Sequence, residues 1–210
     1  MPKIRRGRQH QEKHNEILKH AAALFKEKGY NGVTMDQIAQ AMGLSKLSIY
    51  YYFESKEDLL FSINDIAHSR LLKNMDKILP ADHDPAKKLK MALINHINIL
   101  LSELSPETAA LRQHHSLSPE NRQRLIKKRD KYDRKFQQVI VDGIKQGVFI
   151  DCNPKLAYFA IIGSAGHIVH WYSPGGKFSI EQIADYFAEF LIRALLKEPP
   201  ADTPKPPSPV

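Results

Sequence analysis

The segment of residues 34–53 constrains the fold more than any other part of the chain. Thr34 and Gln37 form a T-x-x-Q capping box, which starts a helix because each side chain satisfies an amide that the first turn leaves unpaired. Gly43 ends this helix, and Ser45 can cap a second short helix that reaches the end of the segment. Two short helices joined by a tight glycine-containing turn are typical of a helix-turn-helix.

The rest of the chain carries the same kinds of helix signal. A helix with an apolar face around Phe25 is expected to follow a flexible basic arm over residues 1–8 and to end at Gly29. N-capping side chains, several of them followed by proline, open further helices. These helices are expected over about residues 55–79, 84–104, 106–115, 118–146, 154–173 and 179–197. Residues 148–150 are interpreted as an apolar link. No segment alternates as a strand would, so the predicted fold is all-α with about nine helices.

Positive charge is concentrated near the N-terminus. The chain has a net charge of +8, and residues 1–56 carry +5 of it. A basic excess in a short segment favours a polyanionic partner, although a solvated surface would have the same composition. The expected organisation is a three-helix helix-turn-helix domain over residues 1–56, a helical domain over residues 57–198, and a disordered proline-rich tail over residues 199–210.

The second helix of the motif carries side chains suited to contact a nucleic acid. Ile49 and Phe53 are four residues apart, so both can pack on the preceding helices. The side chains left on exposed or flanking positions are Lys46, Leu47, Ser48, Tyr50 and Tyr52. Lysine can reach a guanine edge or a phosphate, serine several bases, leucine a thymine methyl, and tyrosine hydroxyls can donate to phosphates. The amides at the helix start near Thr34 can bind a phosphate. An ordinary helical hairpin with a surface aromatic cluster is the alternative interpretation.

Residues 10–60 resemble the N-terminal domain of the TetR family of bacterial repressors. The matching runs are Ile17-Leu18-x-x-Ala21-Ala22-x-Leu24-Phe25-x-x-x-Gly29-Tyr30, Thr34-Met35-Asp36-Gln37-Ile38-Ala39, and Ser48-Ile49-Tyr50-Tyr51-Tyr52-Phe53-Glu54-Ser55-Lys56-Glu57-Asp58-Leu59-Leu60. The resemblance implies a homodimer that binds a short palindrome with its two recognition helices about 34–36 Å apart, and that leaves the DNA when a ligand binds the C-terminal domain. By position, the family's DNA contacts correspond to Thr34, Lys46, Leu47, Ser48, Tyr50, Tyr52 and Lys56. Leu47 stands where many members have glycine.

Residues 118–196 resemble a subgroup of TetR regulators of fatty-acid or steroid catabolism, many of which respond to acyl-coenzyme A thioesters. The matching runs are Arg129-Asp130-Lys131-Tyr132, Gly143-Ile144-x-x-Gly147-x-Phe149, the stretch from Gly163 to Trp171-Tyr172-Ser173-Pro174-Gly175-Gly176, and Ile183-Ala184-Asp185. Gly166-His167 stands where the subgroup often has Asn-Trp. The resemblance implies an acyl-coenzyme A thioester as the candidate effector.

A thioester needs an apolar tunnel for its acyl chain and a basic mouth for its phosphates. The candidate ligand-binding residues are Leu93, Ile97, Leu100, Leu104, Leu111, Tyr132, Phe136, Phe159, Gly163, Gly166 and Trp171. The candidates for the mouth are Arg112, Arg122, Arg124, Lys127, Lys128 and Arg129. The apolar residues would equally suit an ordinary core and the basic ones a solvated face, so both interpretations stay open.

The last two predicted helices are expected to form the dimer interface. Their apolar positions suit a four-helix contact across a two-fold axis. The candidate interface residues are Leu156, Ala160, His167, Phe187, Phe190 and Leu191, together with Phe159, Gly163, Tyr186 and Leu195.

Enzymatic and metal-dependent functions find no support in the motifs. The sequence has no nucleophile elbow, phosphate loop or paired buried acids. The pairs His10/His14 and His167/His170 have no cysteine or carboxylate nearby to complete a metal site. Because Cys152 is the single cysteine and no apolar run approaches the roughly 18 residues of a spanning helix, we expect a cytoplasmic protein with no membrane partner. Since the sequence has neither a catalytic nor a metal-binding motif, we expect no cofactor.

The predicted function is a ligand-responsive transcriptional regulator. It would repress by binding double-stranded operator DNA as a homodimer, and a small hydrophobic effector, such as an acyl-coenzyme A thioester, would release it. A regulator that senses another hydrophobic compound, such as a drug or an aromatic acid, is the first alternative. A helical enzyme or scaffold is the last.

Overall fold

The computed structural model describes residues 2–102 and 116–198, and these residues confirm the all-α prediction. In chain order the helices are α1 (Pro2–Lys28), α2 (Met35–Ala41), α3 (Lys46–Tyr52), α4 (Lys56–Ile78), α5 (Pro85–Leu100), α7 (Pro119–Lys145), α8 (Pro154–Gly166), the 3₁₀ helix η2 (His167–His170) and α9 (Ile180–Arg193). The helix predicted over residues 106–115 lies outside the described residues.

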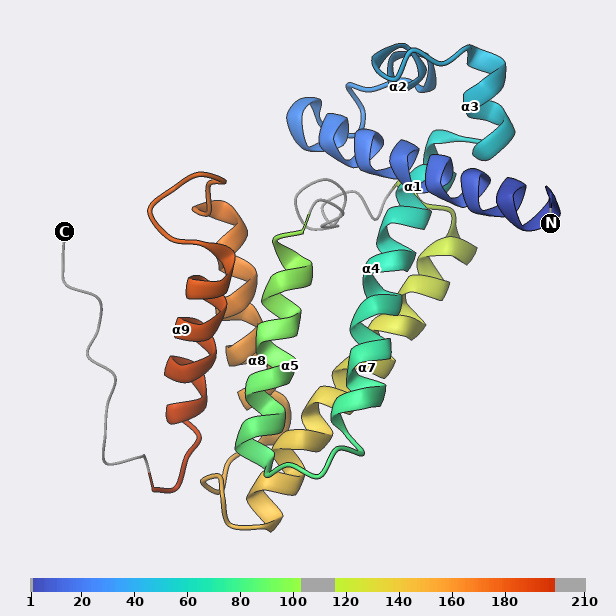
Figure 1. The fold of residues 1–210 in the computed structure, drawn as a ribbon. Helices are drawn as coiled ribbons and strands as arrows, with labels where there is room; N and C mark the ends of the chain where they lie inside the picture. The colour runs from blue at the N-terminus through green and yellow to red at the C-terminus, as the bar shows by residue number, and fades with distance from the viewer. Residues whose placement is uncertain (1, 103–115, 199–210) are drawn as a thin grey trace.

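The first three helices form a head above the remaining helices, which form the body. α1 lies across the upper ends of α4 and α7, and α2 and α3 lie on the side of α1 that faces away from the body (Figure 1). The head has its own apolar core, in which Phe25, Ile38, Ile49 and Phe53 are almost fully buried. The short helices α2 and α3 therefore occupy one end of the molecule, with their outer faces open.

The body is built from long helices that pack side by side. α5 contacts α4, α7, α8 and α9, and it lies between α4 and α9 in Figure 1. Gly143 of α7 lies under the ring of Phe149, because a Cβ atom there would be 2.0 Å from the Cδ2 of that ring. This close approach seats the segment after α7 against its helix.

The capping signals in the sequence predicted where the helices begin. Thr34 and Ser179 each form a complete capping box, with Gln37 and Gln182 as the respective partners. The caps that precede proline, namely Asp84, Ser118 and Asn153, each accept a backbone N–H of the first turn. Gly43, at φ +62°, makes the turn between α2 and α3 in a conformation that favours glycine.

Several predicted helix boundaries are wrong. α1 begins at Pro2, so residues 2–8, which we expected to form a flexible arm, are part of this helix. No signal in the sequence ends the helix between them and the residues that follow. α8 ends at Gly166 and tightens into η2, instead of running to residue 173. α9 ends at Arg193, because the segment after it pairs with residues 148–150: Ile150 N–H donates to the Leu195 carbonyl at 2.8 Å. The predicted apolar link is thus one side of an isolated antiparallel bridge.

One polar contact joins the start of α4 to the start of α7. The carboxylate of Glu57 accepts the backbone N–H of Ser118 at 2.8 Å and the side-chain amide of Asn121 at 2.9 Å. These bonds hold the pKa of Glu57 below its usual value. Leu117 and Leu125, which flank this contact, belong to the apolar core of the head. The upper end of α7 is therefore packed with the head, while the rest of the helix belongs to the body.

Candidate nucleic-acid interface and ligand pocket

The inner face of α3 fixes the direction of its outer face. Ile49 is fully buried and Phe53 is 1% exposed, so this side of the helix is held by the head core. The hydroxyl of Ser45 accepts the Ser48 N–H at 3.1 Å and also lies 2.8 Å from the Ser48 hydroxyl. α3 is thus anchored at its cap and along one side, which leaves the opposite side to solvent.

The outer face of α3 carries a leucine, a lysine and two tyrosines. Leu47 is 84% exposed, Tyr51 73% and Tyr50 42%, and Lys46 is also exposed. Tyr52 is half-buried, because it follows Ile49 by three residues and so lies beside the buried face. Sequence reasoning included Tyr52 and missed Tyr51. The same helical spacing would have placed Tyr51 on the outside.

Two groups that we predicted to bind phosphate already form hydrogen bonds within the head. The ammonium of Lys46 lies 3.1 Å from the carboxylate of Asp36, and this hydrogen bond raises the pKa of Lys46. Thr34 donates its backbone N–H to Gln37 Oε1 at 2.8 Å, and its hydroxyl accepts the Gln37 N–H at 3.2 Å. The capping box therefore uses two of the amides at the start of α2, the site we expected to offer amides to a phosphate.

Lys56 holds the segment between α1 and α2. Its ammonium donates to the carbonyl oxygens of Tyr30 at 2.9 Å and of Val33 at 2.8 Å, and it lies 4.2 Å from the centre of the Tyr30 ring. Burial lowers the pKa of this ammonium. Two of its three N–H groups are thus bound inside the chain, so the residue predicted as a DNA contact also has a structural task.

Two histidines of α1 support the aromatic end of α3. The His10 ring lies 4.8 Å from the ring of Tyr52 and 5.7 Å from that of Tyr51, and His14 lies 4.5 Å from Phe53. The sequence showed these histidines four residues apart but not what they faced. The described residues contain no group of three or more histidine, cysteine or acidic side chains that could hold a metal ion.

A pocket of about 680 Å³ lies between α4, α5, α7 and α8. Of the predicted ligand-binding residues, Leu100, Tyr132 and Phe159 line it. Leu93, Ile97 and Phe136 are fully buried core residues, and Gly163, Gly166 and Trp171 are not among the lining residues. Leu104 and Leu111 lie outside the described residues. The lining residues that sequence reasoning missed are Ala67, His68, Leu71, His96, Ile99, Asp130, Asp133, Arg134, Gln137, Lys155, Tyr158 and Ile162.

Charge is distributed unequally between the rim and the interior of this pocket. Arg129, Arg134 and Lys155 are exposed and stand at the rim. Further in, the hydroxyl of Tyr158 donates to the carboxylate of Asp133 at 2.5 Å. Burial raises the pKa of Asp133 and, as the largest cause, that of Tyr158. The carboxylate of Asp130, which also lines the pocket, lies 3.6 Å from the guanidinium of Arg129, so the rim keeps an excess of positive charge. This excess favours an anionic group, and the interior combines apolar walls with a few polar groups.

His96 and Tyr132 form a second polar pair in the pocket wall. The Nδ1 atom of His96 lies 3.1 Å from the Tyr132 hydroxyl, and the two rings stack with centroids 5.8 Å apart. His96 is 8% exposed and Tyr132 2%. Burial lowers the pKa of His96 to about 4 and raises that of Tyr132, so both side chains are neutral near pH 7.

The other predicted mouth residues are engaged elsewhere. Lys128 donates to Asp65 and Ser69 of α4, Arg122 donates to the Leu117 carbonyl, and the guanidinium of Arg124 lies 4.5 Å from the centre of the Phe61 ring. The contacts of Lys128 and Arg124 tie α7 to α4. Lys127 is exposed and is not among the lining residues, and Arg112 lies outside the described residues.

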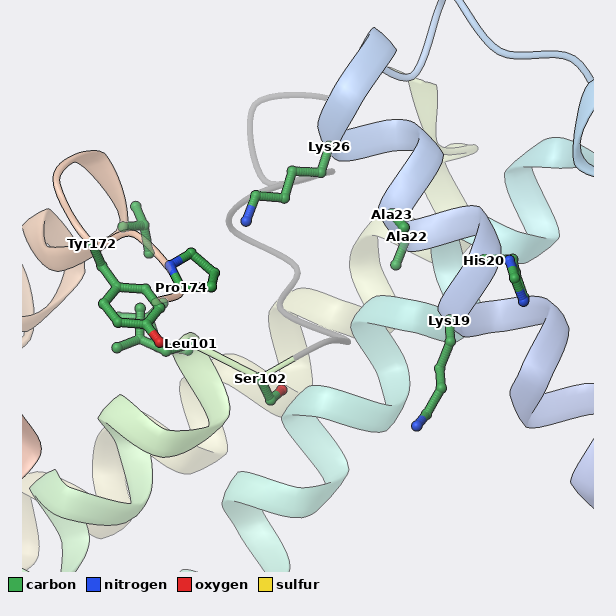
Figure 2. A pocket seen from close by; sticks show the side chains of 11 residues that line it. Lys19, His20, Ala22, Ala23, Lys26, Leu101, Ser102, Tyr172 and Pro174 are labelled. Atoms are coloured by element: carbon green, nitrogen blue, oxygen red, sulfur yellow. The ribbon is translucent and has the colours of Figure 1, made fainter. Parts of the chain in front are cut away.

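A second pocket, of about 490 Å³, lies between the head and the body. It is lined by Lys19, His20 and Lys26 of α1, and by Ser102, Tyr172 and Pro174 of the body, among others. Figure 2 shows the α1 side chains on one side of this space and Tyr172 with Pro174 on the other. Sequence reasoning gave no signal for it, because it joins segments far apart in the chain.

The predicted dimer face is apolar and open to solvent in the single chain. Leu156 is 67% exposed, Phe190 64%, Phe159 52% and Tyr186 48%. The rings of Tyr186 and Phe190 stack with centroids 6.2 Å apart. Ala160, Gly163 and His167 are also exposed, Phe187 and Leu191 are half-buried, and Leu195 is buried.

Comparison with known proteins identifies the family. The family model of bacterial regulatory proteins of the tetR family, which describes their N-terminal part, matches residues 17–63. The family model of the tetracyclin repressor-like C-terminal domain matches residues 82–195, which are more than half of the chain. The chain belongs to the TetR family of bacterial regulatory proteins. It is therefore a transcriptional regulator with a DNA-binding helix-turn-helix, and the family resemblance noted in the sequence is confirmed.

Individual relatives of this TetR-family chain cover most of its length. The HTH-type transcriptional repressor KstR2 of Mycobacterium tuberculosis is 25% identical over 87% of this chain and 92% of its own. The structure of the TetR-family regulator PfmR of Thermus thermophilus is 32% identical, covers 84% of this chain and 97% of its own, and superposes with a TM-score of 0.78. A structure of AibR with isovaleryl coenzyme A and operator DNA is 25% identical in sequence. It covers 85% of this chain and 97% of its own, and it superposes with a TM-score of 0.73. Among the described residues, no helix is both long and apolar enough to cross a bilayer.

Proposed function

We propose that this TetR-family regulator represses transcription as a homodimer on a palindromic operator, and that an acyl-coenzyme A thioester bound in the pocket between α4, α5, α7 and α8 releases it. The observation that carries the DNA-binding half is the outer face of α3, with Lys46, Leu47 and Tyr50 at the open end of the molecule. Ammonium and phenol donors suit phosphates and base edges, and the leucine suits a thymine methyl.

The remaining predicted DNA contacts surround this face. Thr34 and Ser48 stand at the starts of α2 and α3, where helix amides and hydroxyls favour a phosphate. Tyr52 is half-buried, and its ring lies 4.8 Å from that of His10. For Lys56 we propose a double role, in which its third N–H reaches a phosphate while the other two keep the Tyr30 and Val33 carbonyls in place.

Binding to a duplex that the purified protein selects from a random pool tests the DNA-binding half. A duplex of roughly 30 base pairs has room for two half-sites one helical turn apart. Lys46→Ala should weaken binding and lower the magnitude of the slope of log affinity against log salt by about two, because each of the two heads of the homodimer loses one phosphate contact. Lys145→Ala, an exposed lysine at the far end of α7, is the matched control and should leave both quantities unchanged.

Tyr50→Phe removes a single hydroxyl from the outer face of α3, so it should weaken binding without affecting the fold. If the wild type selects no sequence, or if it binds duplex with an affinity that does not depend on salt, the DNA-binding half of the proposal is wrong.

The open apolar face of α8 and α9 supports the homodimer. Exposed aromatic and leucine side chains on α8 and α9 would be buried against the same helices of a second copy, as an isologous interface requires. We propose Leu156, Ala160 and His167 of α8 and η2, with Phe187, Phe190 and Leu191 of α9, as the residues of this interface.

The pocket supports a thioester effector in its size and charge. Its volume of about 680 Å³ is that of a small-molecule site, Leu100 and Phe159 are apolar walls, and Arg129 and Lys155 offer charge to phosphates at the rim. The AibR structure holds a coenzyme A thioester together with operator DNA.

Release of the selected duplex tests the effector. Octanoyl-coenzyme A should release the DNA, whereas octanoic acid and coenzyme A alone should not, because each lacks half of the ligand. Arg129→Ala should weaken the response to the thioester, and Lys145→Ala should not. Release by an aromatic acid or a drug but by no thioester would instead favour the alternative class of effector.

A further inference from the structure

The first turns of α1 carry positive charge that no acidic residue near them in the sequence balances. α1 begins at Pro2, and the first acidic residue of the chain is Glu12. The cations that precede it are Lys3, Arg5, Arg6 and Arg8. The N-terminal end of a helix dipole is positive, so cations in the first turns lower the stability of the helix. Their presence there points to a polyanion that supplies the opposite charge.

These turns lie next to the surface that we propose for DNA. The His10 ring lies 4.8 Å from the ring of Tyr52 and 5.7 Å from that of Tyr51, and both tyrosines belong to the last turn of α3. Tyr51 is 73% exposed, so His10 stands at the edge of the open face of α3. About two turns of α1 precede His10, and they extend about 12 Å along the helix axis beyond this contact.

The helical period divides the four cations between two sides of α1. Lys3, Arg6 and His10 are spaced at i, i+3 and i+7, so they share the side of the helix on which His10 meets α3. By the same period, Arg5 and Arg8 belong to the opposite side. Lys3 and Arg6 are therefore the two cations placed on the side of α1 that would face a duplex bound to α3.

The direction of α1 indicates which part of the duplex its start would reach. The N-terminal end of α1 lies on the side of the molecule away from α8 and α9 (Figure 1). In the proposed homodimer, α8 and α9 meet at the two-fold axis, so the starts of the two α1 helices point away from each other. Each start then lies beside the base pairs outside its half-site, and not beside the centre of the palindrome.

We propose that Lys3 and Arg6 bind phosphates on the outer flank of each operator half-site, so that the start of α1 is a second DNA-binding element beside α3. This inference rests on the proposed function, because it assumes that α3 binds the operator as part of a homodimer. Contacts with phosphates add affinity and fix the position of a protein on the duplex, but they carry no sequence information directly. The flanks can therefore have any sequence.

Two duplexes of different length test the inference. Both carry the selected palindrome, and the longer one extends it by about ten base pairs, roughly one helical turn, at each end. The wild type should bind the longer duplex more tightly. Its slope of log affinity against log salt should be larger in magnitude by about four, because each of the two heads gains two phosphate contacts.

Two pairs of substitutions assign the difference between the duplexes to one side of α1. Lys3→Ala combined with Arg6→Ala should remove most of the difference in affinity and in slope. Arg5→Ala combined with Arg8→Ala is the matched control, since it removes the same charge from the opposite side of the helix. This control should keep the wild-type difference.

Charge reversal separates binding from the stability of the helix. Lys3→Glu combined with Arg6→Glu places acids at the positive end of the helix dipole, so circular dichroism should show a helix content no lower than that of the wild type. The same change repels phosphates, so the longer duplex should bind more weakly than it binds the alanine pair. If the reversal lowers helix content and DNA affinity together, the two cations act through the fold and the inference is wrong.

The remaining outcomes separate this inference from the function beneath it. If the wild type binds both duplexes with equal affinity and slope, or if the two alanine pairs reduce the difference equally, Lys3 and Arg6 make no specific contact with the flanks. The inference is then wrong and the proposed function stands. If the wild type selects no duplex at all, the DNA-binding half of the proposed function is wrong and the inference falls with it.

Discussion

The ammonium of Lys56 makes a local contribution to stability that can be separated from any contact with DNA. It donates to the Tyr30 and Val33 carbonyls, so Lys56→Met leaves two backbone acceptors unpaired. We expect the free energy of unfolding to fall by about 1–3 kcal/mol, the usual effect of losing hydrogen bonds to a charged group. Urea denaturation measures it. Leu47→Ala is the control, because a side chain that is 84% exposed contributes little to stability. An unchanged midpoint for Lys56→Met would contradict the structural role.

His96 should make stability depend on pH in a defined window. Its pKa is about 4 in the folded chain, against 6.5 for an ordinary histidine, so between these values the unfolded chain binds a proton that the folded chain does not. Stability is therefore highest above about pH 6.5 and falls as the pH decreases toward 4, by about 3 kcal/mol from this residue. His96→Leu should remove this part of the slope. Parallel pH curves for the wild type and the variant would show that His96 is not the cause.

At the scale of single residues, the sequence predicted correctly those features that follow from the period of one helix. The spacing of Ile49 and Phe53 correctly predicted which side of α3 is buried, and hence that Lys46 and Leu47 are exposed. It failed for the pocket, where polar residues such as His96 and Tyr158 line the wall. The period of one helix gives its buried side, but it does not say which neighbouring helix lies opposite or where packing leaves a space.

The contact between the starts of α4 and α7 is suited to couple the pocket to the head. α7 carries Tyr132 and Arg129 in the pocket, and its upper end is bound to α4 through Glu57. We predict that Glu57→Ala keeps binding of DNA and of effector but reduces the effect of each on the other. The coupling free energy should fall by about 0.5–2 kcal/mol. DNA affinity measured with and without octanoyl-coenzyme A gives this quantity.

The matched control for Glu57 is Glu120→Ala. Glu120 is an exposed acidic residue in the first turn of α7, and no bond to α4 is described for it. It should leave the coupling unchanged. If the two variants reduce the coupling equally, the effect comes from charge near the start of α7 and not from the Glu57 contact.

At the scale of elements, the sequence predicted the starts of helices better than their ends. Starts depend on local capping, so Asp84, Ser118 and Asn153 with their following prolines were sufficient. The ends of α8 and α9 depend on contacts made far along the chain. α9 ends shortly before Leu196, which pairs with Phe149. No local sequence signal predicts a bridge between two segments that lie so far apart along the chain.

The whole molecule should assemble through the open face of α8 and α9. Phe190 is 64% exposed in the single chain, so Phe190→Lys should change the stability of that chain by no more than about 0.5 kcal/mol. In a homodimer the same change places two unpaired charges in an apolar interface, and the protein should become monomeric. Light scattering after size exclusion measures the mass. The monomer should also bind the selected duplex more weakly, because a single head covers one half-site.

Ile150→Lys is the control for this change, since Ile150 is 40% exposed, lies in the segment after α7 and is not one of the residues proposed for the interface. It should leave both the mass and the DNA affinity unchanged. Leu156→Glu on α8, 67% exposed, should reproduce the effect of Phe190→Lys because both residues belong to the proposed interface. Variants that both remain dimers would place the interface elsewhere. If the wild type is a monomer in solution and binds the selected palindrome as a monomer, the proposed homodimer is wrong.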